Sequence, residues 1–185
     1  MAEVAIVYHS GFGHTKVLAE AVAKGAASVA GTQVDLIPVA EAEGKAAILD
    51  AADAIVFGSP TYMGDVSGPF KTWADSTGKV WYGQGWKDKL AAGFTNSNSP
   101  SGDKLNALQS MWTLAMQHSM IWVSVGIMPQ TEKDGLVLNR LGSFGGAMAT
   151  SLNEAPGPNN PSQDDQATGA ALGKRGAEFA KKLKG

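Results

Sequence analysis

Short apolar runs alternate with segments of helical periodicity along the chain. Runs of strand length, typical of buried strands, occupy residues 4–8, 34–39, 54–58, 90–95 and 120–125. Helical segments lie between and after them, at residues 15–29, 41–51, 68–76, 103–117 and from 163 onward. This alternation predicts an α/β fold with a five-stranded, doubly wound parallel sheet and helices on both faces. No internal repeat or linker interrupts the pattern, so residues 1–185 are expected to form one domain.

Residues that start or stop regular structure divide these elements. Pro60 is expected to end the third strand, because proline cannot donate to a strand ladder. Ser67, followed by Pro69, marks the start of a helix. Ser162 and Asp165 resemble a capping box that opens the last helix.

Two stretches lack a clear periodic pattern. Residues 77–89 are predicted to be loop-like, and the Gly-, Pro- and Asn-rich stretch 126–161 is expected to be mostly irregular. A short strand near 147–152 is expected to complete or extend the fifth strand. Loops this long in compact domains are usually functional or disordered.

The loops that follow the strands locate the candidate site. Open parallel sheets bind ligands at the carboxyl ends of their strands, near the point where the strand order reverses. The loops after the first, third and fourth strands, at residues 9–14, 59–66 and 96–102, should therefore share one ligand.

The first loop has the composition of a phosphate-binding turn. It reads Tyr8-His9-Ser10-Gly11-Phe12-Gly13-His14-Thr15 and precedes a helix, whose free N–H groups and dipole attract anions. Lys16 stands where the dinucleotide fingerprint has its third glycine, and the P-loop Gly-Lys-Ser/Thr is absent. The turn is therefore expected to hold a single phosphate through neutral donors. The alternative is an ordinary strand-to-helix turn.

The second and third loops suit a flat heterocycle. The second, Ser59-Pro60-Thr61-Tyr62-Met63-Gly64-Asp65, is stiffened by proline, and its tyrosine and methionine can cover a ring. The third, Asn96-Ser97-Asn98-Ser99-Pro100-Ser101-Gly102, is dense in small donors and acceptors that suit the ring's polar edge. Alone, each is also compatible with a rigid turn or a helix cap. The fold places all three side by side, which favours a shared ligand site.

Composition restricts the chemistry. The chain has 15 Lys+Arg and 17 Asp+Glu, so its net charge is −2. This composition does not suggest the basic patch that nucleic-acid binding requires. Cysteine is absent, which excludes disulfides and thiolate metal sites, so redox chemistry must come from a bound cofactor and no metal is expected. No signal peptide is found. No apolar stretch approaches the length of roughly 18 residues that a membrane-spanning helix needs. A cytoplasmic protein without membrane insertion is expected.

These features resemble the flavodoxin superfamily, and more closely the WrbA-type NAD(P)H:quinone oxidoreductases (tryptophan-repressor-binding-protein type). The most specific matches are the phosphate turn and the Pro60-Thr61-x-x-Gly64 loop. Other matching residues are Ser67-Gly68, Thr77-Gly78, Trp81, the 96–102 loop, His118, Gly145 and Ala147. The likeness covers nearly the whole chain and implies a flavodoxin-like sheet of order 2-1-3-4-5.

The resemblance implies FMN as cofactor and NAD(P)H as co-substrate. Residues 10–15 would hold the FMN phosphate, residues 60–64 would contact the isoalloxazine and ribityl chain, and residues 96–102 would contact the pyrimidine side. His118 would lie beside the flavin as a proton donor to a quinone, and Trp81 would align the nicotinamide or quinone. The plainer alternatives are a histidine at a helix end and a tryptophan packed in the core.

The function implied is hydride transfer from NAD(P)H to FMN, followed by transfer of both electrons to a quinone in the same pocket. A homodimer or homotetramer is also implied, since neighbouring subunits complete the active site in this family. Tyr62-Met63 replaces the usual Arg-Phe, the 96–102 loop has less glycine, and the segment between strands two and three is shorter. These departures leave the substrate pocket and the oligomeric state open.

Two other functions compete with this interpretation. A flavodoxin-type electron carrier would bind FMN but act on a protein partner, and a flavodoxin-like module without cofactor would bind neither. The mild charge and the long, partly aromatic 77–89 and 126–161 loops argue against the carrier. The intact phosphate turn argues against the cofactor-free module.

Overall fold

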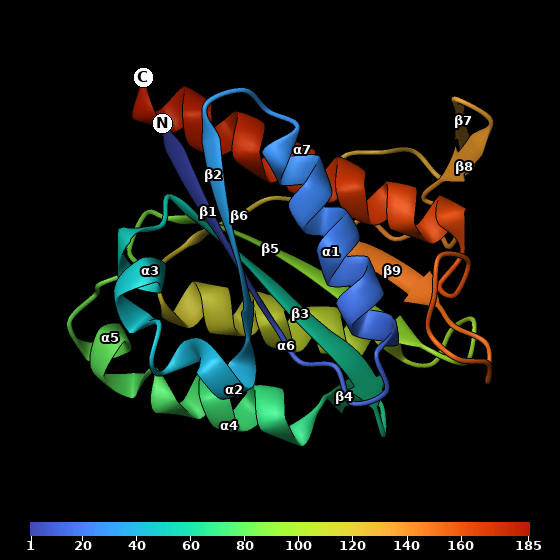
Figure 1. Cartoon of the computed structure of the whole chain (residues 1–185). Helices are drawn as coiled ribbons and strands as arrows, with labels where there is room; N and C mark the ends of the chain where they lie inside the picture. The colour runs from blue at the N-terminus through green and yellow to red at the C-terminus, as the bar shows by residue number, and fades with distance from the viewer.

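A parallel sheet between two layers of helices forms the centre of the computed structural model, which describes residues 1–185 (Figure 1). The strand order is β2-β1-β3-β5-β6, which confirms the predicted order 2-1-3-4-5. These strands are β1 (Ala2–Tyr8), β2 (Thr32–Pro38), β3 (Ala54–Tyr62), β5 (Leu90–Ser97) and β6 (Ile121–Trp122). All pairings along this path are parallel, so the strands start at one edge, the amino edge, and end at the opposite carboxyl edge.

Both faces of the sheet are buried by helices. Successive side chains point to opposite faces, so Ile6 and Val56 pack under α1 and α7, whereas Val7 and Phe57 pack under α2, α3, α4 and α6. The helices are α1 (His14–Ala27), α2 (Val39–Ala42), α3 (Ala46–Ala51), α4 (Gly68–Ser76), α5 (Gly78–Tyr82), α6 (Lys104–Gln117) and α7 (Gln163–Lys184). None of them is long and apolar enough to cross a membrane.

Two short strands share the position beside β5 where a single fifth strand was expected at 120–125. β6 pairs with the first two residues of β5. β9 (Ala147–Thr150) pairs with its last four, which confirms a strand near 147–152 as the extension of the fifth. Between them the chain leaves the sheet and forms an antiparallel pair, β7 (Thr131–Lys133) with β8 (Leu136–Leu138). Val123 and Val125 are buried, so the apolar run at 120–125 correctly indicated buried residues. It overestimated the length of the strand, because only residues 121 and 122 pair with β5.

Pro60 does not end β3, so that prediction was wrong. β3 continues to Tyr62, and Pro60 pairs with Asn96 of β5. Gly58, two residues earlier, directs its carbonyl oxygen toward β1, where it accepts a hydrogen bond from the His9 N–H at 3.0 Å. Pro60 has the same orientation and faces the side on which β1 has already ended. The missing N–H of proline therefore removes no ladder bond.

Three other segments bear on the predicted boundaries. Segment 41–51, expected as one helix, forms α2 and α3 with Gly44 between them, a residue that weakens a helix interior. Residues 77–89, expected as loop, contain the five-residue helix α5. The predicted cap of α7 is confirmed, because Ser162 Oγ accepts a hydrogen bond from the Asp165 N–H at 3.2 Å.

Close packing of α1 against α7 depends on glycine. A Cβ added at Gly173 would lie 2.0 Å from the carbonyl oxygen of Val22 on α1. We expect Gly173→Ala to push the two helices apart and to lower the free energy of unfolding by about 1–3 kcal/mol, measured by urea denaturation.

Gly176 on the same helix provides a matched control. A Cβ at Gly176 would meet nothing within 4 Å. Gly176→Ala should therefore leave the packing intact and raise the free energy of unfolding by about 0.5–1 kcal/mol, the ordinary helix preference of alanine over glycine. Equal effects of the two substitutions would contradict the role given to Gly173.

Candidate functional site

A cavity of about 550 Å³ opens at the carboxyl edge, where β1, β3 and β5 end. Parts of all three predicted loops line it: Phe12, His14 and Thr15 from the first, Pro60, Thr61 and Tyr62 from the second, and Asn96, Ser97 and Asn98 from the third. A fourth segment, residues 151–156, supplies the remaining wall. The parallel sheet thus brings together segments that are far apart in the sequence.

The first loop has the geometry of an anion-binding turn. Ser10 Oγ accepts hydrogen bonds from the N–H groups of Gly13 and Lys16, both at 3.1 Å, which fixes the turn and leaves the hydroxyl hydrogen free to donate. The N–H groups of His14 and Thr15 belong to the first turn of α1, where no intrahelical acceptor exists. That turn contains no acidic residue, so no carboxylate competes for the helix dipole.

Tyr62 closes the cavity against the first loop. Its ring makes edge contacts with His9 and Phe12, with centroids 6.5 and 6.2 Å apart. Its hydroxyl lies over Gly11, where an added Cβ would be only 2.6 Å away. Burial raises the pKa of Tyr62, while a bond from the Gly11 N–H acts in the opposite direction. Tyr62 therefore presents a neutral hydroxyl to the turn.

Buried hydrogen bonds fix the second and third loops relative to each other and to the fourth segment. The hydroxyl oxygens of Thr61 and Thr95 lie 2.7 Å apart on neighbouring strands. Ser151 Oγ donates to Asn96 Oδ1 at 2.8 Å and so ties β5 to the segment after β9. These bonds leave the Asn96 amide NH₂ as a donor at the cavity wall.

The fourth segment falls within the long 126–161 stretch that the sequence marked as able to wall a substrate pocket, but none of its residues was among the predicted site residues. Asn160 organises it: its side chain accepts from the Leu152 N–H at 2.9 Å and donates to the Glu154 carbonyl at 3.0 Å. The His14 ring bonds the same Glu154 carbonyl at 2.9 Å, which joins the segment to the phosphate turn. The many Asn and Pro residues of 153–161 marked an irregular segment but gave no sign of where it lies.

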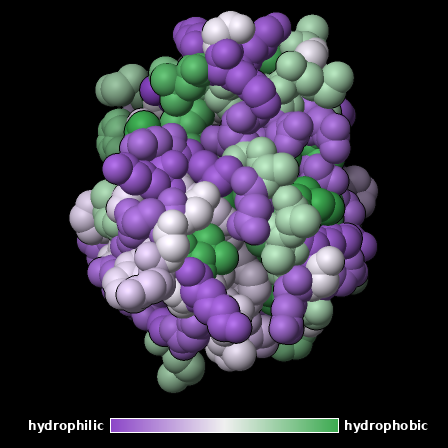
Figure 2. Space-filling view, turned by 90° about the vertical axis from the view of Figure 1, so that its left-hand side faces the viewer, coloured by the Kyte–Doolittle hydropathy of each residue, from purple (hydrophilic) through white to green (hydrophobic).

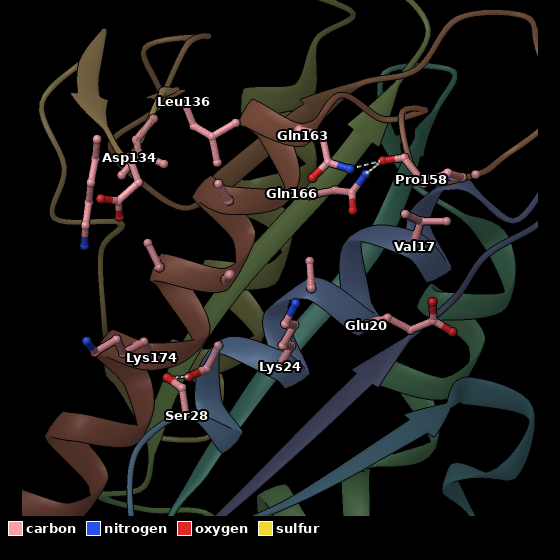
Figure 3. A pocket seen from close by; sticks show the side chains of 18 residues that line it. Val17, Glu20, Lys24, Ser28, Asp134, Leu136, Pro158, Gln163, Gln166 and Lys174 are labelled. Carbon is pink, nitrogen blue, oxygen red and sulfur yellow. Dashed lines mark hydrogen bonds between the residues drawn. The ribbon is translucent and has the colours of Figure 1, made fainter.

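Two glutamines of α7 hold the far end of this segment. The side-chain amides of Gln163 and Gln166 both donate to the carbonyl of Pro158, the second at 2.9 Å (Figure 3). A groove of about 740 Å³ between α1, α7 and the β7–β8 pair lies on this side, and Glu20, Lys24 and Lys174 lie along it (Figure 3).

Lys104 is a second feature that the sequence did not reveal. The residue is fully buried at the start of α6, and its ammonium donates to Ser97 Oγ at 2.8 Å and to the carbonyls of Ser99 and Pro100 at 2.7 and 2.9 Å. It thus holds the third loop from within. Burial lowers the pKa of Lys104 to about 8, and nearby Asp165 partly opposes that shift.

Asp165 extends this charged group behind the cavity. Arg140 donates to both of its carboxylate oxygens, at 3.2 and 2.7 Å, and the Thr150 N–H donates to it at 2.9 Å. The Asp165 side chain is 1% exposed, and its carboxylate accepts hydrogen bonds from Arg140 and Thr150. In a complete capping box it would instead accept from the N–H of Ser162.

Several of the predicted cofactor residues do not line the cavity. They are Ser10, Gly11, Gly13, Met63, Gly64, Ser99, Pro100, Ser101 and Gly102. The first three shape the phosphate turn beneath it. Met63 and Gly64 form the tight reversal between β3 and β4 (Asp65–Val66), with φ of 48° and 83°, and the methionine side chain is fully exposed.

The structure does not bring the predicted catalytic residues His118 and Trp81 to the cavity within one chain. His118 ends α6, a helix that runs roughly 21 Å back from the carboxyl edge to the amino edge. There Ser119 accepts a hydrogen bond from Asp88, just before β5 begins. Trp81 lies in α5 at the same edge, 44% exposed, on a face where hydrophobic residues are scattered among hydrophilic ones (Figures 1 and 2).

The surroundings of His118 are those of a core residue. Its Nε2 lies 2.8 Å from Thr77 Oγ1, its ring lies 4.4 Å from the Trp86 ring, and it is 2% exposed. Burial lowers its pKa and favours the neutral ring. A role at the flavin stays a prediction that needs a neighbouring copy of the chain and exposure of this ring.

Comparison with known proteins places these features in a family. The sequence profile of the NADPH-dependent FMN reductase family matches residues 9–130. The curated Flavodoxin FldP of Pseudomonas aeruginosa (strain UCBPP-PA14) is 43% identical over 171 residues, which cover 89% of each protein. The crystal structure of a flavodoxin, WrbA-like protein from Agrobacterium tumefaciens has 40% identity and a TM-score of 0.79 over 98% of this chain and 99% of its own. An archaeal flavodoxin, 22% identical with a TM-score of 0.69 over 97% and 99% of the chains, shares the fold.

Lys104 gives stability a pH dependence of defined sign. Its pKa is about 8 in the folded protein against 10.5 for an exposed lysine, so between these values the unfolded chain binds a proton that the folded protein has lost. The free energy of unfolding should therefore rise with pH across this window, by at most about 1.4 kcal/mol per pH unit.

Urea denaturation of the wild type and of Lys104→Met across this pH range tests the assignment. Subtracting the variant's profile removes the contribution of every other titrating group. We expect a difference that grows in favour of the wild type as the pH rises from about 8 toward 10.5. A difference that does not change with pH would show that Lys104 is not desolvated in the folded protein.

Proposed function

The chain belongs to the NADPH-dependent FMN reductase family, and from this premise we propose that its carboxyl-edge cavity binds FMN and transfers two electrons from NAD(P)H to a quinone. The observation that carries the proposal is the meeting of the three strand-end loops around one cavity of about 550 Å³. Small-molecule sites in proteins commonly have volumes of roughly 300–1,000 Å³ and lie at this edge of such sheets.

The donors around the first loop fit a phosphate dianion. The Thr15 hydroxyl borders the cavity, and the Ser10 hydroxyl and the N–H groups at the start of α1 belong to the turn beside it, with no carboxylate in the first helical turn. Backbone donors and a helix dipole stabilise an anion without requiring a lysine or arginine. Lys16 in place of the third glycine of the dinucleotide fingerprint favours one phosphate, as in FMN, over a pyrophosphate.

The other walls fit a flavin ring and its ribityl chain. Thr61 and Asn96 are held by buried bonds and offer fixed polar atoms, while Tyr62 offers an aromatic edge. N–H donors near the pyrimidine edge of the ring would stabilise negative charge that develops there, since fixed donors in a site shielded from water cost no reorganisation. Lys104 acts on this wall indirectly, because it holds the loop from Ser97 to Pro100.

FMN, when bound, would supply the hydride and electron chemistry itself. The protein's share would be to hold the phosphate, orient the ring, and place donors at the substrate side. His14, Tyr62 and Glu154 are the titratable side chains that line the cavity. The neutral Tyr62 hydroxyl can donate a hydrogen bond to an acceptor oxygen from within the chain, whereas the His14 ring is already bonded to the Glu154 carbonyl at 2.9 Å.

A flavodoxin-type electron carrier is the second candidate. Two observations favour it: relatives with 43% and 40% identity carry the name flavodoxin, and neither His118 nor Trp81 reaches the cavity within one chain. Such a carrier would hold FMN with the same residues and pass electrons to a protein partner.

Anaerobic reduction of the FMN-loaded protein separates the two candidates. We expect NADH or NADPH to bleach the visible flavin band within seconds, and benzoquinone to restore it, because a hydride acceptor and a substrate pocket share one cavity. A bound flavin that dithionite bleaches but neither nicotinamide does would reject the reductase and leave the carrier.

The phosphate turn gives a prediction that does not depend on turnover. Thr15 is 2% exposed and borders the cavity, so its hydroxyl is expected to donate to the phosphate. Thr15→Val should weaken FMN binding by about 10–100-fold, the usual effect of losing a hydrogen bond to a charged group, and should leave riboflavin binding unchanged. Titration followed by flavin fluorescence measures both.

Thr72→Val, at an exposed position on α4, is the matched control and should change neither affinity. If Thr15→Val weakens FMN and riboflavin equally, the turn does not hold the phosphate.

A further inference from the structure

A lysine is buried where α6 begins, directly behind the third loop of the cavity. Lys104 is 0% exposed, although lysine side chains are almost never fully buried. It is also the first residue of α6, where the positive end of the helix dipole repels a cation. Both placements cost free energy in folding. Departures of this kind from the local rules are expected at functional or strained sites.

The third loop is folded around the Lys104 ammonium. Besides the three acceptors that this loop supplies, Thr150 Oγ1 of β9 lies 3.5 Å from the nitrogen. Gly102 allows the loop to close this tightly, because its φ is 52° and an added Cβ would collide with Ser97 Oγ. Acceptor oxygens around an amine favour its charged form. The loop conformation is therefore matched to a cation.

The charges around Lys104 do not cancel. Asp165 of α7 and Arg140, which follows β8, are the charged groups that act on it, and residues 96–102 of the third loop carry no charge. Arg140 donates to both carboxylate oxygens of Asp165, so this anion is already paired. Two cations and one anion leave this buried charged group with a net charge of +1.

This positive charge lies one side chain away from the cavity. Ser97 lines the cavity, and the Lys104 nitrogen lies 2.8 Å from Ser97 Oγ. Water and salt screen a charge at the surface, but a charge enclosed by protein is screened much less. A ligand in the cavity should therefore experience the charge of Lys104 through the wall without touching it.

The arrangement favours negative charge that develops inside the cavity. If the cavity holds FMN, reduction of the ring by two electrons and one proton leaves one negative charge on it. A charge held away from water is costly unless an opposite charge lies nearby. Glu154, the carboxylate in the cavity wall, is exposed to solvent, so its opposing charge is screened more strongly than that of Lys104.

We propose that the buried charged group of Lys104, Arg140 and Asp165 raises the reduction potential of FMN in the cavity, and that the charge of Lys104 determines the effect. The inference rests on the proposed FMN site, but not on the identity of the electron donor or acceptor. A higher potential makes the ring a better hydride acceptor. Lys104 acts through its charge, so the effect should follow its protonation rather than the shape of its side chain.

The midpoint potential of FMN bound to the wild type and to Lys104→Met tests the proposal. It is measured by slow anaerobic reduction with dithionite beside a redox dye of known potential. At about pH 7 the variant should shift the equilibrium toward the oxidised flavin by about tenfold or more, which corresponds to about 30 mV for a two-electron couple.

The pH profile separates the charge of Lys104 from its packing. The pKa of Lys104 is about 8, so the difference between the two proteins should shrink as the pH rises above this value and the wild-type lysine loses its proton. Negative charge on the ring raises the pKa of Lys104, so the two profiles should meet only well above it. A role in packing alone would give a difference that does not change with pH.

An opposite change of charge provides a second test. Asp165→Asn adds one positive charge to the group and should raise the potential at about pH 6, where Lys104 keeps its proton. Lys104→Gln keeps a donor for the loop carbonyls and should lower the potential even if Lys104→Met fails to fold, which circular dichroism would show. Lys71→Met, at a side chain of α4 that is 62% exposed, is the matched control and should leave the potential unchanged.

Three results would overturn the inference: equal potentials for the wild type and the Lys104 variants at about pH 7, a difference that persists unchanged to about pH 10, or a potential that Asp165→Asn lowers. FMN titration of the same proteins keeps the two proposals apart. A wild type that binds no FMN rejects the proposed function and this inference with it. A wild type that binds FMN with a potential independent of Lys104 rejects this inference alone.

Discussion

The parallel register of β1, β3 and β5 is the constraint on which the site depends. Tyr8 aligns with Gly58, and Pro60 aligns with Asn96, so the three strands finish within a few residues of one another. Their loops must therefore open on the same edge, whatever their sequences. Chemistry is then a matter of which side chains those loops carry, and here the loops carry hydroxyls, amides and glycines. Pro60 marks the limit of this register, since it stands where β1 no longer offers an acceptor.

A buried charged group maintains the geometry that the register begins. Lys104 joins the third loop to α6, and Asp165 joins β9 to Arg140 and the start of α7. Buried charges are tolerated only when hydrogen bonds satisfy them, and both side chains have several. The bonds from Lys104 to the loop would be lost in any other loop conformation and would leave a buried ammonium unsatisfied. This group therefore favours the observed loop conformation. The cavity wall is thus held by bonds within the protein itself.

Much of the fold followed from local patterns, and the rest from contacts that no local pattern encodes. The strands themselves and the start of α4 after Ser67 followed from apolar runs and breaker residues, which act over a few positions, whereas the strand order came from the resemblance to flavodoxins. The fourth wall of the cavity depends on Asn160 and His14, which are 146 residues apart. The position of the Lys104 ammonium depends partly on Thr150 of β9, 46 residues away, which no pattern around residue 104 encodes. His118, whose role was implied by resemblance alone, lies at the amino edge that its helix dictates, and its role at the flavin stays a prediction.

The two helical layers of this protein differ in what they expose, and that difference follows from their tasks. The α1 and α7 layer is rich in Lys and Glu, so its outer surface is well hydrated, while α1 also presents its N-terminus to the phosphate turn. The α4 and α6 layer also packs apolar residues against the sheet but leaves Trp112 and Met116 exposed. A helix that has already buried one apolar face gains nothing in folding from a second. The exposed apolar side chains of α6 are therefore not explained by the folding of the single chain, whereas the charged outer surface of α1 and α7 is what a solvated helix layer requires.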